Sequence, residues 1–368
     1  MLIAAMGCAQ SEQRSSTPIT DAGSDTDSTH ETEPNPELGT PPSDAADPSA
    51  SPDEDWPADC EYRVVLRAHG QSAAGDRTPY AIAAGSEYHA AFYFEPAIGD
   101  APLQLLKSRE LVDNRKFIHH NMLYAIHAGD FDDGAILNDL AQSLILTDPS
   151  TGAEYLLGGV PGTNAIDMPD GVGLRMPAGK LALVLVVHYL NPSDTRAVDR
   201  SGVEVCLTSK KRPVDATAHW LGKLELNLPP HEHTDVTQTC TPELSQGRAH
   251  IMALTPHMHL MATHSNVVLR RASGQSITLL DKPFTFSEQR MYHMPEDGSA
   301  ADVVIERGDS IITTCSFDNT TDNEIIWGQH STDEMCFLTV WAWPAGSIRN
   351  QSGLGPELGI KPDQACLD

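Results

Sequence analysis

LALVLVVHYL, residues 181–190, is a run of aliphatic residues with one histidine, His188, near its polar end. The run is well short of the ~20 apolar residues that a membrane-spanning helix needs. Its valines favour an extended backbone, because a β-branched side chain is restricted in a helix. We therefore predict a buried strand here, in which a lone histidine is often only a packed core residue.

Short runs of the same kind recur on both sides of it from residue 60 onward, among them YRVVLRA, YHAAFYF, SNVVLRR and CFLTVWAW. Gly, Pro, Asn and Asp residues separate these runs, and no long 3.6-residue pattern is present. The polar, proline-containing stretch 210–219 lies midway. We predict an all-β fold with two tandem antiparallel β-sandwich, jelly-roll-like domains, at 58–212 and 213–368.

The chain opens with MLIAAMGCAQS, in which small residues precede Cys8. This resembles the lipobox of a bacterial lipoprotein, with residues 1–8 as a truncated signal, because a basic region and a full apolar region are missing. A buried N-terminal strand is the alternative. Residues 9–57 are rich in Ser, Thr, Pro, Asp and Glu without apolar periodicity, which predicts a disordered acidic spacer. Such a spacer would suit an exported domain tethered through lipid on Cys8.

The formal net charge is −27. This argues against nucleic acid and against an anionic membrane surface as partners. With Cys8 set aside, the cysteine number is even and no CxxC pair is present, so three disulfides in an oxidising compartment are the simplest interpretation. A reduced cytosolic set is the alternative. We expect an exported protein, located in the cell envelope, the periplasm or outside the cell. The six remaining cysteines are Cys60, Cys206, Cys240, Cys315, Cys336 and Cys366.

KFIHHNMLY, residues 116–124, places His119 and His120 side by side in a predicted strand. Successive side chains on a strand point to opposite faces. The two rings can share one purpose only if the strand ends or bulges there. Otherwise, one histidine packs inward and the other faces water.

LTPHMHL, residues 254–260, places His257 and His259 at i, i+2, and therefore on one face of a strand. His231 and His233 have the same spacing, but Pro, Glu and Asp surround them, so we predict an exposed turn. Met335 lies in a polar stretch beside Cys336. A methionine usually fills a gap in the core, but a thioether added to two imidazoles suits Cu(I) better than zinc.

A His-His pair, a lone strand histidine, a His-x-His and a Met-Cys within STDEMC (331–336) follow one another in the chain. This order resembles the type II copper, ascorbate-dependent monooxygenase family, which includes peptidylglycine α-hydroxylating monooxygenase and dopamine β-monooxygenase. The resemblance covers residues 58–368. It implies one copper in each domain, two per chain: an electron-transfer copper held by His119, His120 and His188, and an oxygen-binding, catalytic copper held by His257, His259 and Met335.

The same resemblance implies hydroxylation of a C–H bond of a small substrate with O2 and ascorbate or another one-electron donor, across a solvent-filled separation between the coppers. It also implies the disulfides Cys60–Cys206, Cys240–Cys366 and Cys315–Cys336. The peptide-amidating members have an Arg where this chain has Thr255, and an Asn and a Tyr at Phe337 and Thr339. A carboxylate clamp cannot be built from these residues, so we expect a neutral or apolar substrate and a monomeric enzyme.

Two other classes stay open. One is a copper-binding lipoprotein without turnover. The other is a zinc-dependent hydrolase or a lectin-like sandwich. Met335 argues against zinc, and the sequence places no glutamate beside the histidines as an evident general base.

Overall fold

The structure is a computed structural model in which the chain divides into two compact units, Met1–Ala50 and Ser51–Asp368. All described residues lie in the second unit. The predicted signal, the lipidation site Cys8, most of the acidic spacer and Cys366 lie outside the described residues. The residues that the structure describes are 56–137, 153–159, 166–223, 225–287, 289–295, 303–328, 330–348, 354–355 and 359–360.

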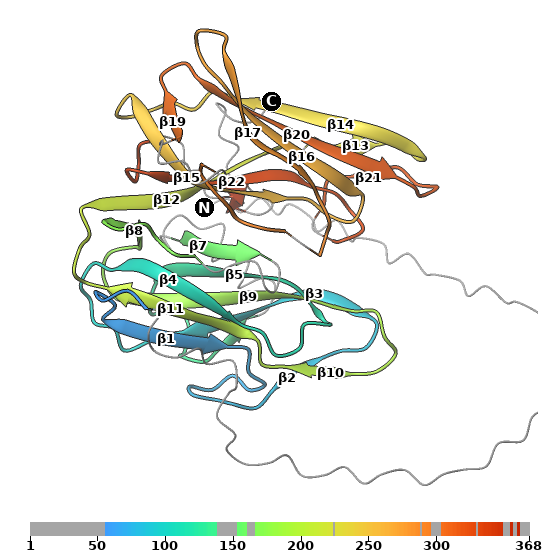
Figure 1. Ribbon diagram of the computed structural model, residues 1–368. Coiled ribbons are helices and arrows are strands. Elements are labelled where there is room, and N and C mark those ends of the chain that lie inside the picture. Colours follow the sequence, from blue (N-terminus) through green and yellow to red (C-terminus); the bar gives the residue numbers. More distant parts are fainter. Residues whose placement is uncertain are drawn as a thin grey trace, which may run out of the picture. The chain divides into compact units, whose positions relative to one another are not determined.

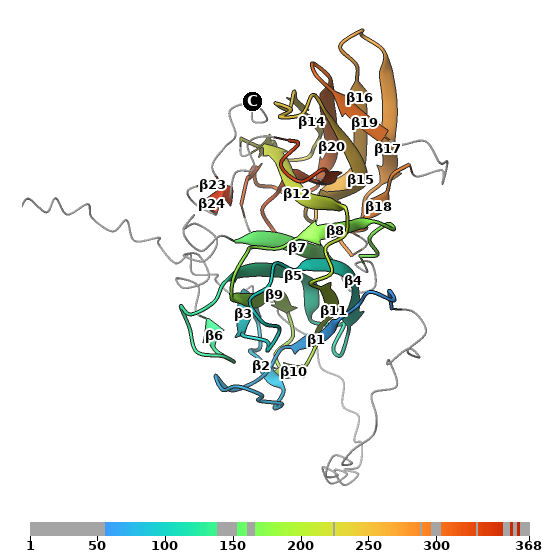
Figure 2. The ribbon, with the colours of Figure 1, turned by 90° about the vertical axis from the view of Figure 1, so that its left-hand side faces the viewer.

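The described residues form strands and no helix, which confirms the predicted all-β class (Figure 1, Figure 2). One sheet has five strands. At its centre β9 pairs with β3 on one side and with β5 on the other. In spatial order the strands are β6 (Ile136–Leu137), β3 (Ser86–Phe94), β9 (Leu181–Asn191), β5 (Ile118–His127) and β7 (Glu154–Gly159).

Strand β9 is buried on both faces, as its continuous aliphatic run predicts. Leu183, Leu185 and Val187 enter the main core of the first half of the second unit, which corresponds to the predicted domain at 58–212. Val184 and Val186 enter a second cluster on the opposite face of the sheet. The alternation of side chains along a strand therefore supplies two apolar layers from one run.

A nine-stranded sheet extends from the first half of the unit into the second. Its strands β8 and β12 are parallel, with Val172 opposite Val214, and they join the two halves. The order is β1 (Tyr62–Arg67), β11 (Gly202–Thr208), β4 (Gln104–Leu111), β8 (Val172–Arg175), β12 (Val214–Lys223), β22 (Cys336–Trp343), β15 (Arg248–His257) and β18 (Tyr292–His293), with β19 (Val303–Glu306) also paired to β15.

A four-stranded sheet completes the second half. It contains β14 (Glu232–Cys240), β20 (Ser310–Asn319), β16 (Ala262–Arg270) and β17 (Ser276–Pro283) in that order. Three small two-stranded pairs are β2 (Tyr80–Ile82) with β10 (Ala197–Asp199), β13 (Asn227–Leu228) with β21 (Ile325–Ile326), and β23 (Leu354–Gly355) with β24 (Gly359–Ile360).

The apolar cores follow the two halves only in part. One cluster draws on residues 221–348 alone. The main core of the first half also takes in Met252, Ala253 and Trp341 from the second half. One sheet and one core therefore cross the predicted boundary between residues 212 and 213. The division into two separate sandwich domains stays a prediction.

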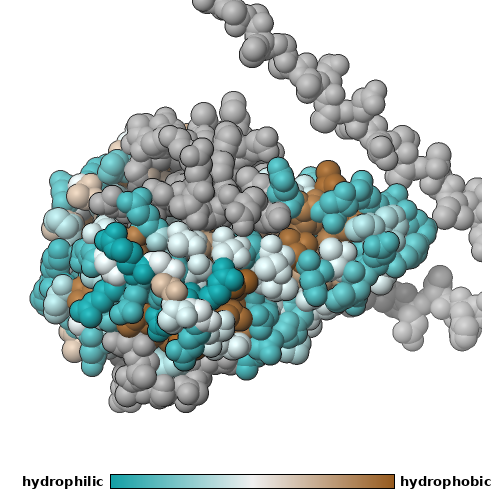
Figure 3. All heavy atoms as spheres, turned by 90° about the horizontal axis from the view of Figure 1, so that it is seen from above, coloured by the Kyte–Doolittle hydropathy of each residue, from teal (hydrophilic) through white to brown (hydrophobic). Residues whose placement is uncertain are grey.

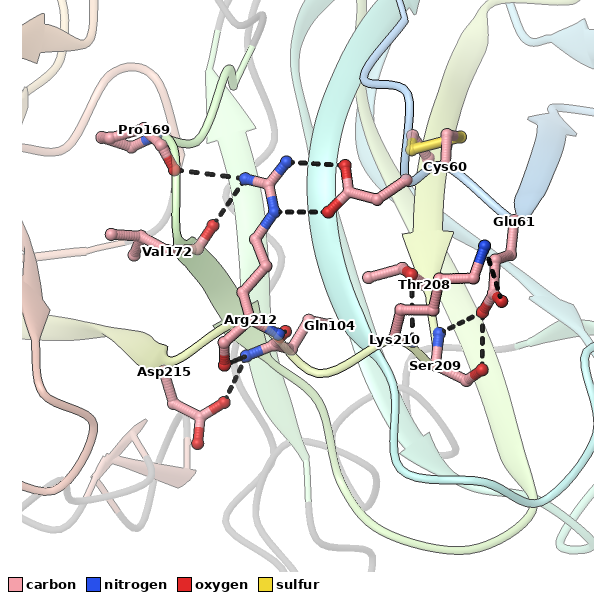
Figure 4. Close-up of polar contacts among 12 residues, drawn as sticks. Cys60, Glu61, Gln104, Pro169, Val172, Thr208, Ser209, Lys210, Arg212 and Asp215 are labelled. Atoms are coloured by element: carbon pink, nitrogen blue, oxygen red, sulfur yellow. Dashed lines mark hydrogen bonds and ion pairs between the residues drawn. A yellow bond between two sulfur atoms is a disulfide. The ribbon is translucent and has the colours of Figure 1, made fainter.

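The stretch 210–219, predicted as the joint, is held by the buried side chain of Arg212 (Figure 4). Its guanidinium donates to both carboxylate oxygens of Asp59, at 2.8 and 2.9 Å. It also donates to the carbonyl oxygens of Pro169 and Val172, at 3.1 and 2.8 Å. The side-chain oxygen of Gln104 accepts from the Arg212 backbone N–H at 2.7 Å. Arg212 thus fixes the turn from which β12 leaves toward the second half.

We expect Arg212→Met to lower the free energy of unfolding by about 2 kcal/mol, since hydrogen bonds to a charged group contribute about 1.5–3 kcal/mol and Asp59 is partly exposed. The hydrogen bond from Arg212 holds the pKa of Asp59 below its ordinary value. This stability is therefore present above the unfolded pKa of about 3.9 and is lost as the pH falls through the lower folded value.

Urea unfolding at pH 7 and at pH 3 checks both parts of this prediction. Arg175→Met removes a more exposed ion pair with Glu154 and should cost less than ~1 kcal/mol. An Arg212→Met protein as stable as wild type at pH 7 would contradict the prediction.

Disulfides join Cys60 to Cys206 and Cys315 to Cys336, two of the pairs that the resemblance implies. Cys240 is disulfide-bonded as well, and its predicted partner lies outside the described residues. The guanidinium groups of Arg63 and Arg109 each lie 5.2 Å from the ring centroid of Trp56. Trp56 is therefore packed against the folded part although it precedes the predicted boundary at 58.

The face seen in Figure 3 carries mostly hydrophilic residues with a few hydrophobic ones between them. Exposed large hydrophobic side chains such as Leu260 and Ile326 come from separate elements, which is normal for a globular surface. The described part of the chain contains no helix long and apolar enough to cross a membrane.

Candidate metal centre

The His-His pair lies at a β-bulge. The register of β5 against β9 shifts between Ile118 and His120, so His119 is the extra residue. A bulge changes the direction of the side chain beside it. The rings of His119 and His120 consequently lie 4.8 Å apart, centroid to centroid. The structure therefore contains the bulge that two adjacent histidines on a strand need if their rings are to converge.

His188 completes a cluster with both of them. Its ring centroid is 4.9 Å from that of His120 and 5.2 Å from that of His119. The structure thus brings together all three histidines predicted for the first site. It adds His89 of β3, whose ring stacks on His188 at 4.1 Å. Sequence reasoning missed His89, because its position beside His188 depends on the pairing of β3 with β9.

The nitrogen atoms of this cluster suit a metal ion. The Nε2–H of His188 donates to Oε1 of Glu87 at 3.0 Å, so its Nδ1 carries the free lone pair. The Nδ1 atoms of His188 and His120 are buried and have no hydrogen-bond partner among the described residues. Buried polar atoms are normally satisfied, and a metal ion between these rings would satisfy them.

The second set is built around the end of β15. His257 is its last residue, and the ring of His259 lies 5.3 Å from that of His257. The Nδ1–H of His257 donates to Oε1 of Gln289 at 2.6 Å, and the Nδ1–H of His259 donates to the carbonyl of Asp333 at 3.2 Å. Both rings therefore keep Nε2 as the atom available to a metal ion. Metal-ligating histidines typically donate their other ring N–H to an acceptor in this way, which fixes the tautomer.

Met335 is tied to this set through Glu334, a residue of the STDEMC stretch for which sequence reasoning gave no role. Glu334 is fully buried. Its Oε2 accepts from the backbone N–H groups of His259 at 2.8 Å and of Met335 at 3.1 Å. Its Oε1 accepts from the N–H of Met261 at 2.6 Å. One carboxylate therefore holds the segment that carries Met335 against the segment that carries His259.

The two sets adjoin each other. The rings of His120 and His257 are 5.5 Å apart. Gln289, which accepts from His257, lies 3.5 Å from Nε2 of His119 through its amide nitrogen. The ring of His119 stacks on Phe286 at 3.5 Å. The expected solvent-filled separation is therefore wrong for this structure, because Phe286 and Gln289 pack between the two sets.

Glu87 makes a second connection. Besides His188, its carboxylate accepts from the backbone N–H and the hydroxyl of Ser331, at 2.8 and 3.0 Å. Burial works to raise the pKa of Glu87, but the hydrogen bonds from His188 and Ser331 lower it to about 2. Sequence reasoning missed Glu87, which is separated from His188 by 101 positions in the chain. Its low pKa suits an acceptor that orients His188 rather than a general base.

Five imidazoles of the two sets, those of His89, His119, His120, His257 and His259, have lowered pKa values and are neutral at pH 7. Burial, followed by the neighbouring histidines, lowers the pKa of His89 to about 3 and holds the pKa of His119 and His120 far below the ordinary range. Burial likewise lowers the pKa of His257 to about 4 and of His259 to about 3. Neutral imidazole is the form that binds metals.

The residues that differ from the peptide-amidating pattern lie beside this second set. Thr255 of β15 pairs with Thr339 of β22, and both are buried. Phe337 is buried as well and forms an aromatic cluster with Met335, Trp220 and Trp327. These positions therefore present apolar and hydroxyl groups rather than cations.

The other His-x-His pair is exposed, as predicted. His231 bonds Asp322 at 2.8 Å, and His233 bonds Asp318 at 2.6 Å. His233 belongs to strand β14 rather than to the turn. Aspartates hold both rings in place, with His233 also 3.3 Å from Asp235, so this pair is distinct from the candidate metal centre.

Residues 216–351 match the family model of the copper type II ascorbate-dependent monooxygenase, C-terminal domain. This segment contains the second set, His257, His259 and Met335. DBH-like monooxygenase protein 1 from Gallus gallus is 25% identical over 255 residues, which are 63% of this chain and 40% of the relative. Dopamine beta-hydroxylase from Canis lupus familiaris is 28% identical over 200 residues, which are 50% and 31% of the two chains.

The chain spans less than half the length of these curated relatives. A solved structure described as the STIV MCP superposes with a TM-score of 0.29 at 9% identity, over 78% of this chain and 97% of its own, which is too low to inform the fold. The family model and the two relatives support the copper type II ascorbate-dependent monooxygenase family that the motifs indicate.

Proposed function

We propose that this protein is a copper-dependent monooxygenase that hydroxylates a C–H bond of a small substrate with O2 and ascorbate or another one-electron donor. One observation carries the proposal: His120 and His188 keep buried nitrogen atoms without a partner among the described residues, and Glu334 ties a methionine to the adjoining pair His257 and His259. Imidazole with thioether is a ligand set that suits copper.

Copper supplies one-electron redox chemistry toward O2. His119, His120 and His188 would hold the electron-transfer ion, and His257, His259 and Met335 would hold the ion at which oxygen reacts. The surrounding residues orient these ligands. Glu87 fixes the tautomer of His188, Gln289 fixes that of His257, and the carbonyl of Asp333 fixes that of His259.

The substrate that fits the second set is neutral or apolar. Trp220, Trp327 and Phe337 place aromatic groups around Met335. Thr255 stands where a peptide-amidating relative would have an arginine, so a carboxylate on the substrate would find no bidentate partner at this position. A small organic molecule bound through its apolar body is the class that these residues support.

Export agrees with this chemistry. The disulfides Cys60–Cys206 and Cys315–Cys336 belong to an oxidising compartment. We propose a monomer in the cell envelope, in the periplasm or outside the cell, attached to the membrane only through a lipid on Cys8. O2 and a small molecule are then its partners.

We expect purified protein to bind two copper ions per chain. His188→Ala should remove about one of them, because the second set keeps all three of its ligands. Metal analysis after copper loading, together with oxygen uptake in the presence of ascorbate and candidate substrates, tests the proposal. Two coppers without substrate-dependent oxygen uptake would favour a copper-binding protein without turnover. Zinc retained after copper loading would overturn the copper assignment.

A further inference from the structure

We propose that His89 is a fourth imidazole ligand of the first metal centre, beside His119, His120 and His188. The inference rests on the proposed copper chemistry, because it adds a ligand to the same ion. Neither the sequence motifs nor the matched family segment assigns a role to His89, which lies on β3 far from both in the chain.

The strand register places three histidines in a row. His89 lies directly opposite His188 across β3 and β9. His188 in turn lies opposite His120 across β9 and β5. Residues paired in this way point to the same face of a sheet. The row therefore crosses three neighbouring strands on one face, and His119 joins it through the bulge.

The distances within the row fit a single ion. One nitrogen of each of His89, His120 and His188 lies within 4.8 Å of the other two. With metal–nitrogen bonds of about 2.0–2.1 Å, two nitrogens on opposite sides of an ion are about 4 Å apart. The row thus needs to contract by less than about 1 Å to bind one ion.

His89 is more than a packing partner of His188. The two rings stack at 4.1 Å with an interplanar angle of 20°, and a phenyl ring could stack in the same way. Yet Glu87, two positions earlier on the same face of β3, already orients His188. A fourth nitrogen would complete an all-nitrogen set of the kind that suits Cu(II). It would thereby favour the oxidised ion at the site that donates an electron.

The test compares His89→Phe with the parent protein in a His259→Ala background, which leaves one intact set of ligands for copper. His89→Phe keeps a ring that can stack but removes the nitrogen. His250→Phe is the matched control, because His250 is also a half-buried ring and stacks on Trp343 at 3.7 Å. X-ray absorption counts the histidines per copper, and competition with a chelator gives the Cu(II) affinity.

We expect the histidine count to fall from four to three in His89→Phe and the Cu(II) affinity to fall by at least about 10-fold, with His250→Phe like the parent. Exogenous imidazole should restore the affinity of a second variant, His89→Ala. A parent with three histidines per copper, or a His89→Phe protein that binds like the parent, would overturn the inference. Neither readout depends on turnover. Oxygen uptake is measured separately on the protein with both ligand sets intact, and copper bound through His89 without oxygen uptake in that protein would overturn the proposed function alone.

Discussion

Met335→Ile should fold and bind Cu(II) like wild type, yet lose Cu(I) affinity at the second site and about 100-fold or more of the hydroxylation rate, equivalent to ~2.7 kcal/mol of transition-state stabilisation. A thioether is a soft ligand that favours Cu(I) and is dispensable for Cu(II). The exchange is close to volume-conserving, so the packing loss in the aromatic cluster should stay under ~1.5 kcal/mol.

Met176→Ile is the matched control, because Met176 is a buried methionine of the main core and lies outside the segments that carry the predicted ligands. It should show the same small loss of stability and full activity. X-ray absorption of the reduced proteins then separates the two roles of a methionine. If Met335 only fills space, both variants turn over like wild type. A copper–sulfur shell that survives Met335→Ile would show that another residue is the ligand.

The strands and the bulge at the His-His pair could be predicted from the sequence, because both depend on local pattern, whereas the assignment of metal ligands rests on the family resemblance. The run at 181–190 is continuous in aliphatic residues, and it is a strand buried on both faces. The His-His pair requires a bulge to converge, and the bulge is present at His119. Such features depend on how side chains alternate along one strand, which the sequence of that segment alone reveals.

The neighbours of the ligands could not be predicted, because they depend on which strands pair. His89 and Glu87 reach His188 only through the register of β3 against β9. Gln289 reaches His257 from a connecting segment between β17 and β18 with no pattern of its own. The parallel pair β8–β12, which makes one sheet of the two halves, likewise has no sequence signature. The solvent-filled separation was expected by resemblance alone, and the packing of Phe286 against His119 contradicts it.

The role of Glu334 could not be predicted from the sequence either, although the residue lies within the STDEMC motif. Its partners are backbone N–H groups, and every non-proline residue carries one, so no pairing of residue types marks the contact. Only the fold shows that its carboxylate spans His259, Met261 and Met335. Burial raises the pKa of Glu334 to about 7 against the opposing effect of these donors. The residue beside the methionine is therefore part of the site.

Glu334→Gln should lower the free energy of unfolding by about 1–3 kcal/mol, because an amide has one acceptor oxygen where the carboxylate has two, and at least one buried N–H loses its partner. Since the same group holds Met335 against His259, we also expect Cu(I) binding at the second site to weaken by about 10-fold or more, in the range seen when outer-shell partners of metal ligands are replaced. Glu334→Ala, which leaves three donors without an acceptor, should be less stable still.

Thermal unfolding and Cu(I) competition measure the two effects separately. Glu324→Gln makes the same chemical change at an exposed glutamate that accepts from Asn227, and it should leave both quantities unchanged. If Glu334 only stabilised the fold, Glu334→Gln studied well below its melting temperature would bind Cu(I) at the second site as tightly as wild type. If it positions the ligands, the affinity falls at every temperature while the first centre keeps its copper, because none of the ligands proposed for that centre bonds to Glu334.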